Sequence, residues 1–309
     1  MEFSESEVIA ELSRIFTRDD PRVLVGIGDD AAVITSPMQK TVITTDMAVE
    51  GVHFRREWST AEEIGRRITA ANLADVYAMG ATPEHVVVAI SLTGHESMTW
   101  IKELARGIEM ESRSCDVLVV GGDIVRGPVI TISMTALGQI DRPILRDGAK
   151  VGDRIVISNL PGWSAAGLYF LQHNINVSAL QPAKSVERAL AQMRAPEVHY
   201  SDAIALRNAH AMCDISDGLL VQAGQMATKT RFLLSSRLIQ LHPDFDELSA
   251  LAAQVDVDVW DWVAAGGEDH AFLAAGIDLI GFDIGEVVQG KGVELQGVER
   301  KPKGFTHFA

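Results

Sequence analysis

Five short segments of the sequence place acidic residues beside glycine or threonine, at the expected ends of strands or starts of helices. Most of them adjoin strongly apolar stretches in which Lys and Arg are scarce. They are Gly28-Asp29-Asp30, Thr44-Thr45-Asp46, Asn72-Leu73-Ala74-Asp75, Gly121-Gly122-Asp123 and Asp214-Ile215-Ser216-Asp217-Gly218. A carboxylate in such surroundings must form an ion pair, take up a proton or meet a cation. Oxygen ligands without His or Cys clusters favour a hard cation, Mg²⁺ or Ca²⁺.

Each segment also has an ordinary structural interpretation. Asp30 and Asp46 suit turns or loops after strands, and Asp217 has the position of an N-cap for the helix that follows. Asp75 is harder to explain in this way, because it lies on an otherwise apolar helical face. The other members of that face, at helical spacing, are Ile68, Asn72 and Met79. All five segments together are harder to explain structurally than any one of them.

Several familiar motifs are absent or incomplete. The chain has no G-x-x-x-x-G-K-[ST] sequence, which excludes a P-loop kinase. Residues Gly26 to Ala31 imitate a dinucleotide-binding turn, but a strand-like run follows and two acids would repel a pyrophosphate. The segment from Gly162 to Ala166 lacks the second glycine of a nucleophile elbow. The histidines show no spacing typical of paired metal ligands.

Composition narrows the class of protein. The 309 residues are 47% apolar, the mean hydropathy is only +0.12, and the formal net charge is −15. We therefore expect no membrane span, and a surface that repels nucleic acid. The acidic N-terminus predicts no secretory signal. Two cysteines, Cys115 and Cys213, cannot build a disulfide framework. These features favour a cytoplasmic protein.

Periodicity and turn residues predict alternating strands and helices. The expected helices span residues 4–16, 59–79, 97–112, 162–170, 185–193 and 201–208, with another beginning near Asp217; Thr60 and Glu63 have capping-box spacing. The expected strands span residues 23–27, 31–35, 41–47, 86–92, 115–120, 129–137, 154–158 and 212–215. A polar, turn-rich run from Asp141 to Gly148 marks a boundary. The prediction is two α/β domains, residues 1–140 and 141–309.

The acidic segments, in their order along the chain, resemble those of the thiamine-monophosphate kinase family. The resemblance is carried by Gly26-Ile27-Gly28-Asp29-Asp30-Ala31-Ala32-Val33, Thr44-Thr45-Asp46-Met47-Ala48-Val49-Glu50-Gly51-Val52-His53-Phe54, Asn72-Leu73-Ala74-Asp75-Val76, Met79-Gly80-Ala81-Thr82-Pro83, Gly121-Gly122-Asp123, Asp214-Ile215-Ser216-Asp217-Gly218-Leu219 and Gly266-Gly267-Glu268-Asp269. Some of these segments are also similar to the wider superfamily of aminoimidazole ribonucleotide synthase. The resemblance implies two α/β domains, and a homodimer whose N-terminal sheets pair into a barrel.

The resemblance also implies site residues, the cofactor Mg²⁺ in several ions, and the substrates ATP and thiamine monophosphate. The positions similar to the family's magnesium ligands are Asp30, Thr44, Thr45, Asp46, Asp75, Asp123, Asp214 and Asp217. Those similar to its ATP contacts are Gly122, Asp123, Arg146 and Ser216, and those similar to its acceptor contacts are His53, Glu268 and Phe305. Asp46, Asp75 and Asp123 are the predicted catalytic residues.

The chain departs from the family pattern in a few places. The family usually has Tyr-Glu-Leu after Gly-Glu-Asp, where this chain has His270-Ala271-Phe272. The helix before Gly107 often carries a tyrosine that contacts the nucleotide, where this chain has Ala105. These departures concern the nucleotide and acceptor contacts, and the acidic segments are intact.

The implied chemistry is consistent with these residues. A phosphate monoester has a second pKa of about 6, so at pH 7 it is already a nucleophile that needs no general base. Two like charges at ~4 Å repel by about 4 kcal/mol at an effective dielectric of 20, and Mg²⁺ ions held by the aspartates would offset this. Two alternatives remain open: another ATP-dependent enzyme of the superfamily, or a non-catalytic Mg²⁺–nucleotide binding protein.

Overall fold

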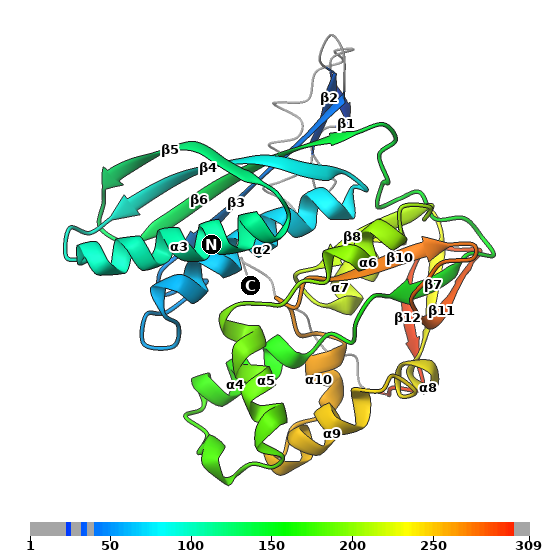
Figure 1. The fold of residues 1–309 in the computed structure, drawn as a ribbon. Helices are drawn as coiled ribbons and strands as arrows, with labels where there is room; N and C mark the ends of the chain where they lie inside the picture. The colour runs from blue at the N-terminus through cyan, green and yellow to red at the C-terminus, as the bar shows by residue number, and fades with distance from the viewer. Residues whose placement is uncertain (1–22, 26–31, 36–39, 300–309) are drawn as a thin grey trace, which may run out of the picture.

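Two six-stranded sheets, joined by the segment between residues 140 and 154, organise the molecule (Figure 1). The computed structural model describes residues 23–25, 32–35 and 40–299. The predicted helix at residues 4–16, Asp30 and Phe305 lie outside the described residues. The mixed α/β class is confirmed.

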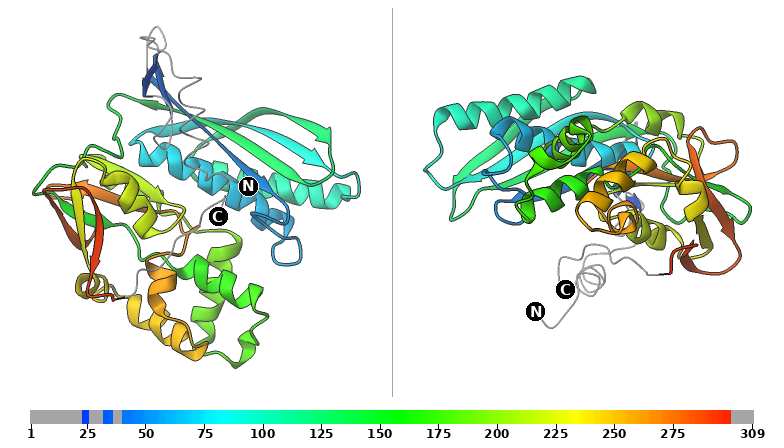
Figure 2. Two further views of the ribbon diagram at one scale, coloured as in Figure 1. Left: turned by 180° about the vertical axis from the view of Figure 1, so that it is seen from behind. Right: turned by 90° about the horizontal axis from the view of Figure 1, so that it is seen from below.

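The first sheet has the strand order β1-β2-β3-β6-β4-β5 and is antiparallel except for the parallel pair β4 and β5. Its strands are β1 (Val23–Val25), β2 (Ala32–Thr35), β3 (Lys40–Val49), β4 (Thr82–Leu92), β5 (Leu118–Arg126) and β6 (Thr131–Ile140). Helices α2 (Ala61–Ala78) and α3 (Met98–Ser114) cover one face of this sheet (Figures 1 and 2). The period of two along β3 follows from this layering: Val42, Thr44 and Ala48 are buried, while Thr45 and Met47 are exposed.

Helix α2 begins where the sequence predicts. Thr60 is its N-cap and accepts a hydrogen bond from the backbone N–H of Glu63, and the Glu63 side chain accepts one from the backbone N–H of Thr60. The capping box is thereby confirmed. Further along, α2 approaches α3 so closely that a Cβ on Gly107 would lie 2.0 Å from the carbonyl oxygen of Glu62. This close packing anchors the helix that carries Asn72 and Asp75.

Removing the cap should destabilise the fold without touching the site. We expect Thr60→Ala to lower the free energy of unfolding by about 1 kcal/mol, because the side chain loses two hydrogen bonds, one accepted from the Glu63 N–H and one donated to the Glu63 carboxylate. Urea denaturation of the variant and the wild type measures the difference. Ser97, which caps α3 by accepting a hydrogen bond from Trp100 N–H, offers the matched control: Ser97→Ala should cost less, since it removes one such bond. Equal stability of Thr60→Ala and the wild type would contradict the expectation.

The second sheet has the order β12-β9-β11-β7-β10-β8, with helices packed beside it (Figure 1). Its strands are β7 (Arg154–Ile157), β8 (Ala211–Ile215), β9 (Arg231–Ser235), β10 (Ala271–Gly276), β11 (Phe282–Val288) and β12 (Gly292–Gln296). The helices of this part are α4 (Trp163–Gln172), the 3-10 helix η1 (Val177–Ala179), α5 (Ala183–Arg194), α6 (Tyr200–Ala205), α7 (Leu219–Met226), α8 (Ser236–Ile239), α9 (Phe245–Gln254) and α10 (Val259–Val263). Helix α2 packs against β3 and β6 of the first sheet and against β8 of the second.

One apolar core crosses between the two sheets. Met79 of the first part and Met212 and Phe272 of the second belong to the same buried cluster. A second cluster lies within the C-terminal part, around Trp163 and Phe170. The core shared by both sheets brings the ends of β8 and β10 against α2.

Two local predictions were wrong. The predicted strand at residues 115–120 is observed at Leu118–Arg126, so Gly121, Gly122 and Asp123 lie inside it. Gly122 permits this, because a Cβ there would meet the carbonyl oxygen of Val88 on the neighbouring strand at 1.9 Å.

The N-cap interpretation of Asp217 is also wrong. The N-cap of α7 is Gly218, with φ of 109° and no side-chain cap.

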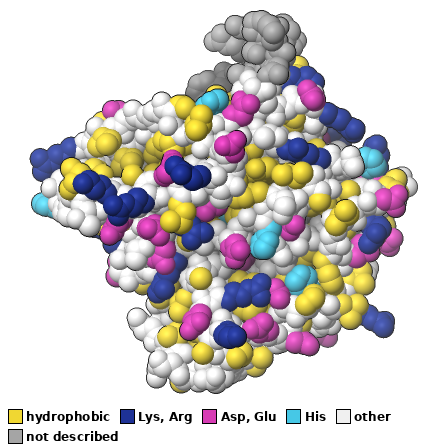
Figure 3. Space-filling model, viewed as in Figure 1, with side chains coloured by type: hydrophobic (Ala, Val, Ile, Leu, Met, Phe, Trp, Pro, Cys, Tyr) yellow, Lys and Arg dark blue, Asp and Glu magenta, His cyan; other side chains and the backbone are white. Residues whose placement is uncertain are grey.

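No helix within the described residues is both long enough and apolar enough to cross a bilayer. On the face shown in Figure 3, Lys and Arg side chains are interspersed with Asp and Glu.

Candidate active site between the two sheets

The predicted site residues of α2 and β3 are joined by side-chain hydrogen bonds. Thr44 donates from its hydroxyl to Oδ2 of Asp75 over 2.8 Å. Asn72 Oδ1 accepts from the backbone N–H of Asp46 at 3.3 Å, and Asn72 Nδ2 donates to the carbonyl of Ile68 at 2.8 Å. Asn72 is fully buried. It therefore fixes Asp46 relative to the helix that carries Asp75.

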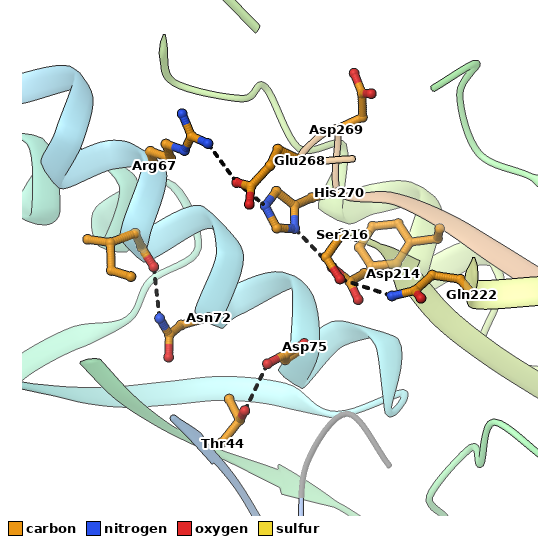
Figure 4. Close-up of polar contacts among 12 residues, drawn as sticks. Thr44, Arg67, Asn72, Asp75, Asp214, Ser216, Gln222, Glu268, Asp269 and His270 are labelled. Carbon is orange, nitrogen blue, oxygen red and sulfur yellow. Dashed lines mark hydrogen bonds and ion pairs between the residues drawn. The ribbon is translucent and has the colours of Figure 1, made fainter. Parts of the chain in front are cut away.

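A second group of polar side chains approaches α2 from the C-terminal part. His270 Nδ1 lies 2.9 Å from Oδ2 of Asp214, and its Nε2 lies 3.9 Å from Oε2 of Glu268. Glu268 in turn accepts from Arg67 of α2 at 2.9 Å, and Arg67 also donates to the carbonyl of Met193 at 2.7 Å. Figure 4 shows this chain of contacts, from Arg67 through Glu268 and His270 to Asp214.

The loop before β10 is held in place by backbone contacts. Phe272 pairs with Asp214 between β10 and β8. His270 N–H donates to the carbonyl of Ile215 at 3.1 Å, and Glu268 N–H donates to that of Ser216 at 2.7 Å. Glu268 and His270 both have positive φ, 66° and 51°, a strained conformation for residues other than glycine. Such strain is often found at functional sites.

Asp269 points in a different direction from its neighbours, as Figure 4 shows. Its carboxylate accepts from the backbone N–H groups of Gly162 at 2.7 Å and Ser164 at 3.0 Å, at the start of α4. Burial raises the pKa of Asp269 to about 6 against the effect of these bonds. We interpret Asp269 as the residue that fixes the loop to α4.

Electrostatics indicate that the carboxylates of the two groups share one region. Burial, together with the negative charge of Asp214, raises the pKa of Asp46 to about 6. Burial also raises the pKa of Asp75 well above its usual value, with contributions from Asp46 and Asp214. Burial alone lowers the pKa of His270, but its hydrogen bond to Asp214 and the nearby carboxylate of Glu268 outweigh this and raise it to about 10. Desolvation raises the pKa of Glu268, and Arg67 and His270 reverse this, so that it lies well below its usual value.

The raised pKa of Asp46 predicts a pH-dependent cost to folding in the absence of divalent cations. Its folded pKa of about 6 lies above the unfolded value of 3.8, so the folded chain binds a proton that the unfolded chain releases. Stability linked to Asp46 therefore falls as the pH rises through this window. A separation of about two pH units corresponds to at most about 3 kcal/mol. We expect Asp46→Asn to gain stability relative to the wild type between pH 4 and pH 7, measured by urea denaturation in EDTA. A difference that stays constant with pH would contradict this.

A cation fits part of this arrangement. Asp214 Oδ1 is buried without a hydrogen-bond partner among the described residues, and the Asp214 carboxylate raises the pKa of both Asp46 and Asp75. Within residues 23–25, 32–35 and 40–299, no three His, Cys, Asp or Glu side chains gather closely enough to form a complete metal site. Mg²⁺ does not require one, because it usually keeps several waters and binds one or two carboxylates together with substrate phosphates. Asp46, Asp75 and Asp214 are the residues that would hold it.

The predicted ligands are divided between the two faces of the first sheet. Thr44 faces α2, whereas Thr45 is exposed on the other face and bonds Met134 O and Thr135. Asp123 aligns across β4 and β6 with Met47, so its side chain belongs to the same exposed face as Thr45. It is also three strands away from β3, at about 4.8 Å per strand. Within one chain, Asp123 is therefore not brought together with Asp46 and Asp75.

The predicted nucleotide contacts Arg146 and Ser216 meet at α7. Arg146 donates to Gln225, and Ser216 accepts from Gln222 Nε2 at 2.9 Å. Both glutamines belong to α7, which follows directly after Asp217 and Gly218. Gly122, the other predicted contact, lies away from them on β5 at the edge of the first sheet.

The described acceptor contacts, Glu268 and His53, lie on different elements. Glu268 lies in the polar group beside α2, while His53 lies in the turn after β3, where its Nδ1 accepts from Val49 N–H at 3.1 Å. A cavity of about 360 Å³ lies beside the two residues that follow Glu268, and its lining includes Arg66, Gln192, Asp269 and His270. It is large enough for a small heterocycle.

Sequence reasoning missed three residues of this site: Arg67, His270 and the orienting role of Asn72. Nothing near Arg67 in the sequence marked it, and its partner is 201 positions away. His270 was noted as a departure from the family pattern without a role. The signal that could have drawn attention to it is its place directly after Gly-Gly-Glu-Asp.

Comparisons with known proteins agree with this architecture. The sequence model of the family described as AIR synthase related protein, N-terminal domain, matches residues 28–140. The thiamine-monophosphate kinase of Corynebacterium glutamicum is 37% identical over 289 residues, which cover 90% of this chain and 86% of that protein. The thiamine-monophosphate kinase of Aquifex aeolicus is 30% identical over 295 residues, which cover 91% of this chain and 92% of that protein.

Two solved structures extend the likeness to three dimensions. The structure described as AaThiL complexed with AMPPCP and TMP has a TM-score of 0.88 at 27% identity, and the match covers 99% of this chain and 98% of that one. The thiamine-monophosphate kinase of Stenotrophomonas maltophilia K279a has a TM-score of 0.75 at 30% identity, covering 97% and 98% of the two chains. The chain therefore belongs to the thiamine-monophosphate kinase family.

Proposed function

We propose that this protein transfers the terminal phosphoryl group of ATP to thiamine monophosphate and forms thiamine diphosphate. The observation that carries the proposal is the set of carboxylates Asp46, Asp75 and Asp214 between the two sheets of a member of this family, in which Asp214 raises the pKa of Asp46, and Asp46 and Asp214 raise that of Asp75. Their mutual repulsion is relieved when a cation binds, and the reaction requires cations between two polyanions.

The side chains would divide the task as follows. Asp46, Asp75 and Asp214 hold cations, Thr44 and Asn72 fix the orientation of the first two, and Asp217 and Asp30 complete the set. When bound, Mg²⁺ supplies charge neutralisation between the two substrates. No general base is needed, because the acceptor phosphate is largely dianionic at pH 7. Catalysis then depends on positioning and charge.

We further propose that the nucleotide lies near α7, with Arg146 donating a charge-assisted hydrogen bond to the triphosphate and Ser216 beside it. Thiamine carries a cationic thiazolium ring, which Glu268 would offset, while His53 and Phe305 contact the acceptor. The cavity of about 360 Å³ that Asp269 and His270 line is a suitable place for its heterocyclic end. In this proposal residues 1–140 supply the cation ligands Asp30, Asp46 and Asp75, and residues 141–309 supply Asp214, Asp217 and the nucleotide contacts Arg146 and Ser216.

We also propose that the protein works as a cytoplasmic homodimer whose N-terminal sheets pair. The edge strand β5 supports this, because five of its apolar side chains are exposed: Leu118, Val119, Val120, Ile124 and Val125. An open edge of this kind readily pairs with another chain. Pairing would also give Thr45, Gly122 and Asp123 a covered environment. Light scattering coupled to gel filtration tests it: a monomer at micromolar concentration would refute the dimer.

The decisive experiment is incubation with ATP, Mg²⁺ and thiamine monophosphate, followed by chromatographic detection of thiamine diphosphate. We expect one thiamine diphosphate per ADP formed, and a rate that continues to rise when Mg²⁺ exceeds ATP. ATP consumption with another acceptor would indicate a different enzyme of the superfamily. ATP binding without any turnover would indicate a non-catalytic nucleotide-binding protein.

A further inference from the structure

His270 is in contact with carboxylates that serve two different purposes in the proposed function. Its Nδ1 bonds Asp214 Oδ2 at 2.9 Å, on the cation side, and its Nε2 faces Glu268 Oε2 at 3.9 Å, on the acceptor side. The ring is 3% exposed and Asp214 is 1% exposed. Figure 4 shows the imidazole lying between the two carboxylates.

The contact with Asp214 leaves one carboxylate oxygen available. Oδ2 is occupied by His270, while Oδ1 is buried without a hydrogen-bond partner among the described residues. A carboxylate held through one oxygen presents the other in a defined direction, which is how outer partners orient metal ligands. Asp214 acts electrostatically on both Asp46 and Asp75, so the free oxygen belongs to their region.

The contact with Glu268 is supported from the opposite side. Arg67 donates to the same Oε2 at 2.9 Å, so the Glu268 carboxylate is held between a guanidinium and an imidazole. Arg67 is itself anchored by the carbonyl of Met193, and His270 by the carbonyl of Ile215. Because Arg67 and His270 are both anchored to the backbone, a shift of the imidazole ring changes the positions of the Asp214 and Glu268 carboxylates together.

We propose that His270 is a positioning residue that holds the cation ligand Asp214 with one ring nitrogen and the acceptor ligand Glu268 with the other. The inference rests on the proposed function and deepens it: cation binding and acceptor binding are coupled through a single imidazole. In this role His270 acts on the reaction through Asp214 and Glu268.

Two near-isosteric substitutions separate the two ring nitrogens. In His270→Asn the amide nitrogen takes the place of Nδ1, which keeps the bond to Asp214 and removes the contact with Glu268. In His270→Gln the amide nitrogen takes the place of Nε2, which does the reverse. Both variants remove the same positive charge, so any difference between them reports geometry. Asn also tolerates the φ of 51° better, so the Tm of each variant is measured alongside.

The first readout is Mg²⁺ binding without substrates, measured by calorimetry and by the Mg²⁺ concentration that raises the Tm half-maximally. The second is the KM for thiamine monophosphate at saturating ATP. We expect His270→Gln to need about tenfold more Mg²⁺ than His270→Asn, a typical cost of losing the partner of a metal ligand. We expect the KM to change in the opposite order, with His270→Asn higher than His270→Gln by about threefold to tenfold.

The outcomes decide the matter. The proposal is supported if His270→Gln mainly weakens Mg²⁺ binding and His270→Asn mainly raises the KM. If only one variant folds, the proposal is supported when that variant loses its expected property and keeps the other. Parallel losses in both variants that follow the Tm, no difference between the variants, or failure of both to fold would show a purely structural role and overturn it. If the wild type forms no thiamine diphosphate, the proposed function fails, while the Mg²⁺ comparison still tests the link between His270 and Asp214.

Discussion

Asp75→Asn is expected to abolish phosphoryl transfer while leaving the protein at least as stable as the wild type. The carboxylate lies where burial, Asp46 and Asp214 all raise its pKa, so its charge opposes folding at pH 7. An amide removes that charge and can keep the hydrogen bond that Thr44 donates, because its oxygen still accepts it. Loss of the Asp75 carboxylate should lower kcat by about 10²- to 10³-fold, since this group would hold a cation beside the phosphoryl group on which charge develops during transfer. Thiamine diphosphate formation and the Tm without divalent cations are the two measurements.

The combination of lost activity and unchanged or higher Tm distinguishes this site from an ordinary structural acid. Asp278 provides the matched control, because it is exposed in the turn between β10 and β11 and has a φ of 54° that asparagine accepts. Asp278→Asn should change neither property. Activity of Asp75→Asn within a few-fold of the wild type would remove Asp75 from the cation site.

Gly267→Ala is expected to have the second largest effect. A Cβ at this position would lie 2.1 Å from the carbonyl oxygen of Ser216. The backbone on both sides of this contact is held by hydrogen bonds from Glu268 N–H to Ser216 and from His270 N–H to Ile215. The loop must then move away from β8, carrying Glu268 and His270 with it. We expect a loss of about 2 kcal/mol in stability and about a hundredfold fall in kcat/KM, since displacements of about 1 Å have such effects on positioned groups.

Gly224 of α7 is the matched control for a glycine substitution. A Cβ there would meet its nearest neighbour, Cγ1 of Val293, at an ordinary 3.7 Å. Gly224→Ala should be neutral or stabilising by about 0.5–1 kcal/mol, because alanine favours the helix. Urea denaturation and steady-state kinetics compare the two variants. If Gly267→Ala kept wild-type kinetics, the close contact between the loop and Ser216 would not be needed for positioning.

Local sequence signals predicted the elements well where a capping pair or a regular period was present. The capping box at Thr60 and Glu63 and the buried face around Asn72 both depend on residues within a few helical turns, and both are observed. The prediction of β5 was wrong because Gly121-Gly122 reads locally as a turn. Only pairing with β4, where a side chain at position 122 would collide with Val88, makes glycine suitable for a strand there.

The candidate site was predicted in part. The acids were identified from their apolar surroundings, but whether two of them face the same side of a sheet depends on register, and register placed Thr45 and Asp123 on the face opposite α2. Arg67 was missed because its partner Glu268 is 201 positions away in the sequence. No pattern of neighbouring residues carries that information.

By itself the sequence determined the elements, the family and the acids that lack nearby positive charge, because these depend on residue types and on spacings of a few positions. The tertiary structure alone decided which carboxylates share a region and that His270 lies between Asp214 and Glu268. Those relations arise from α2 packing against both sheets, where the burial of apolar side chains brings distant segments together and forces the polar groups among them into contact.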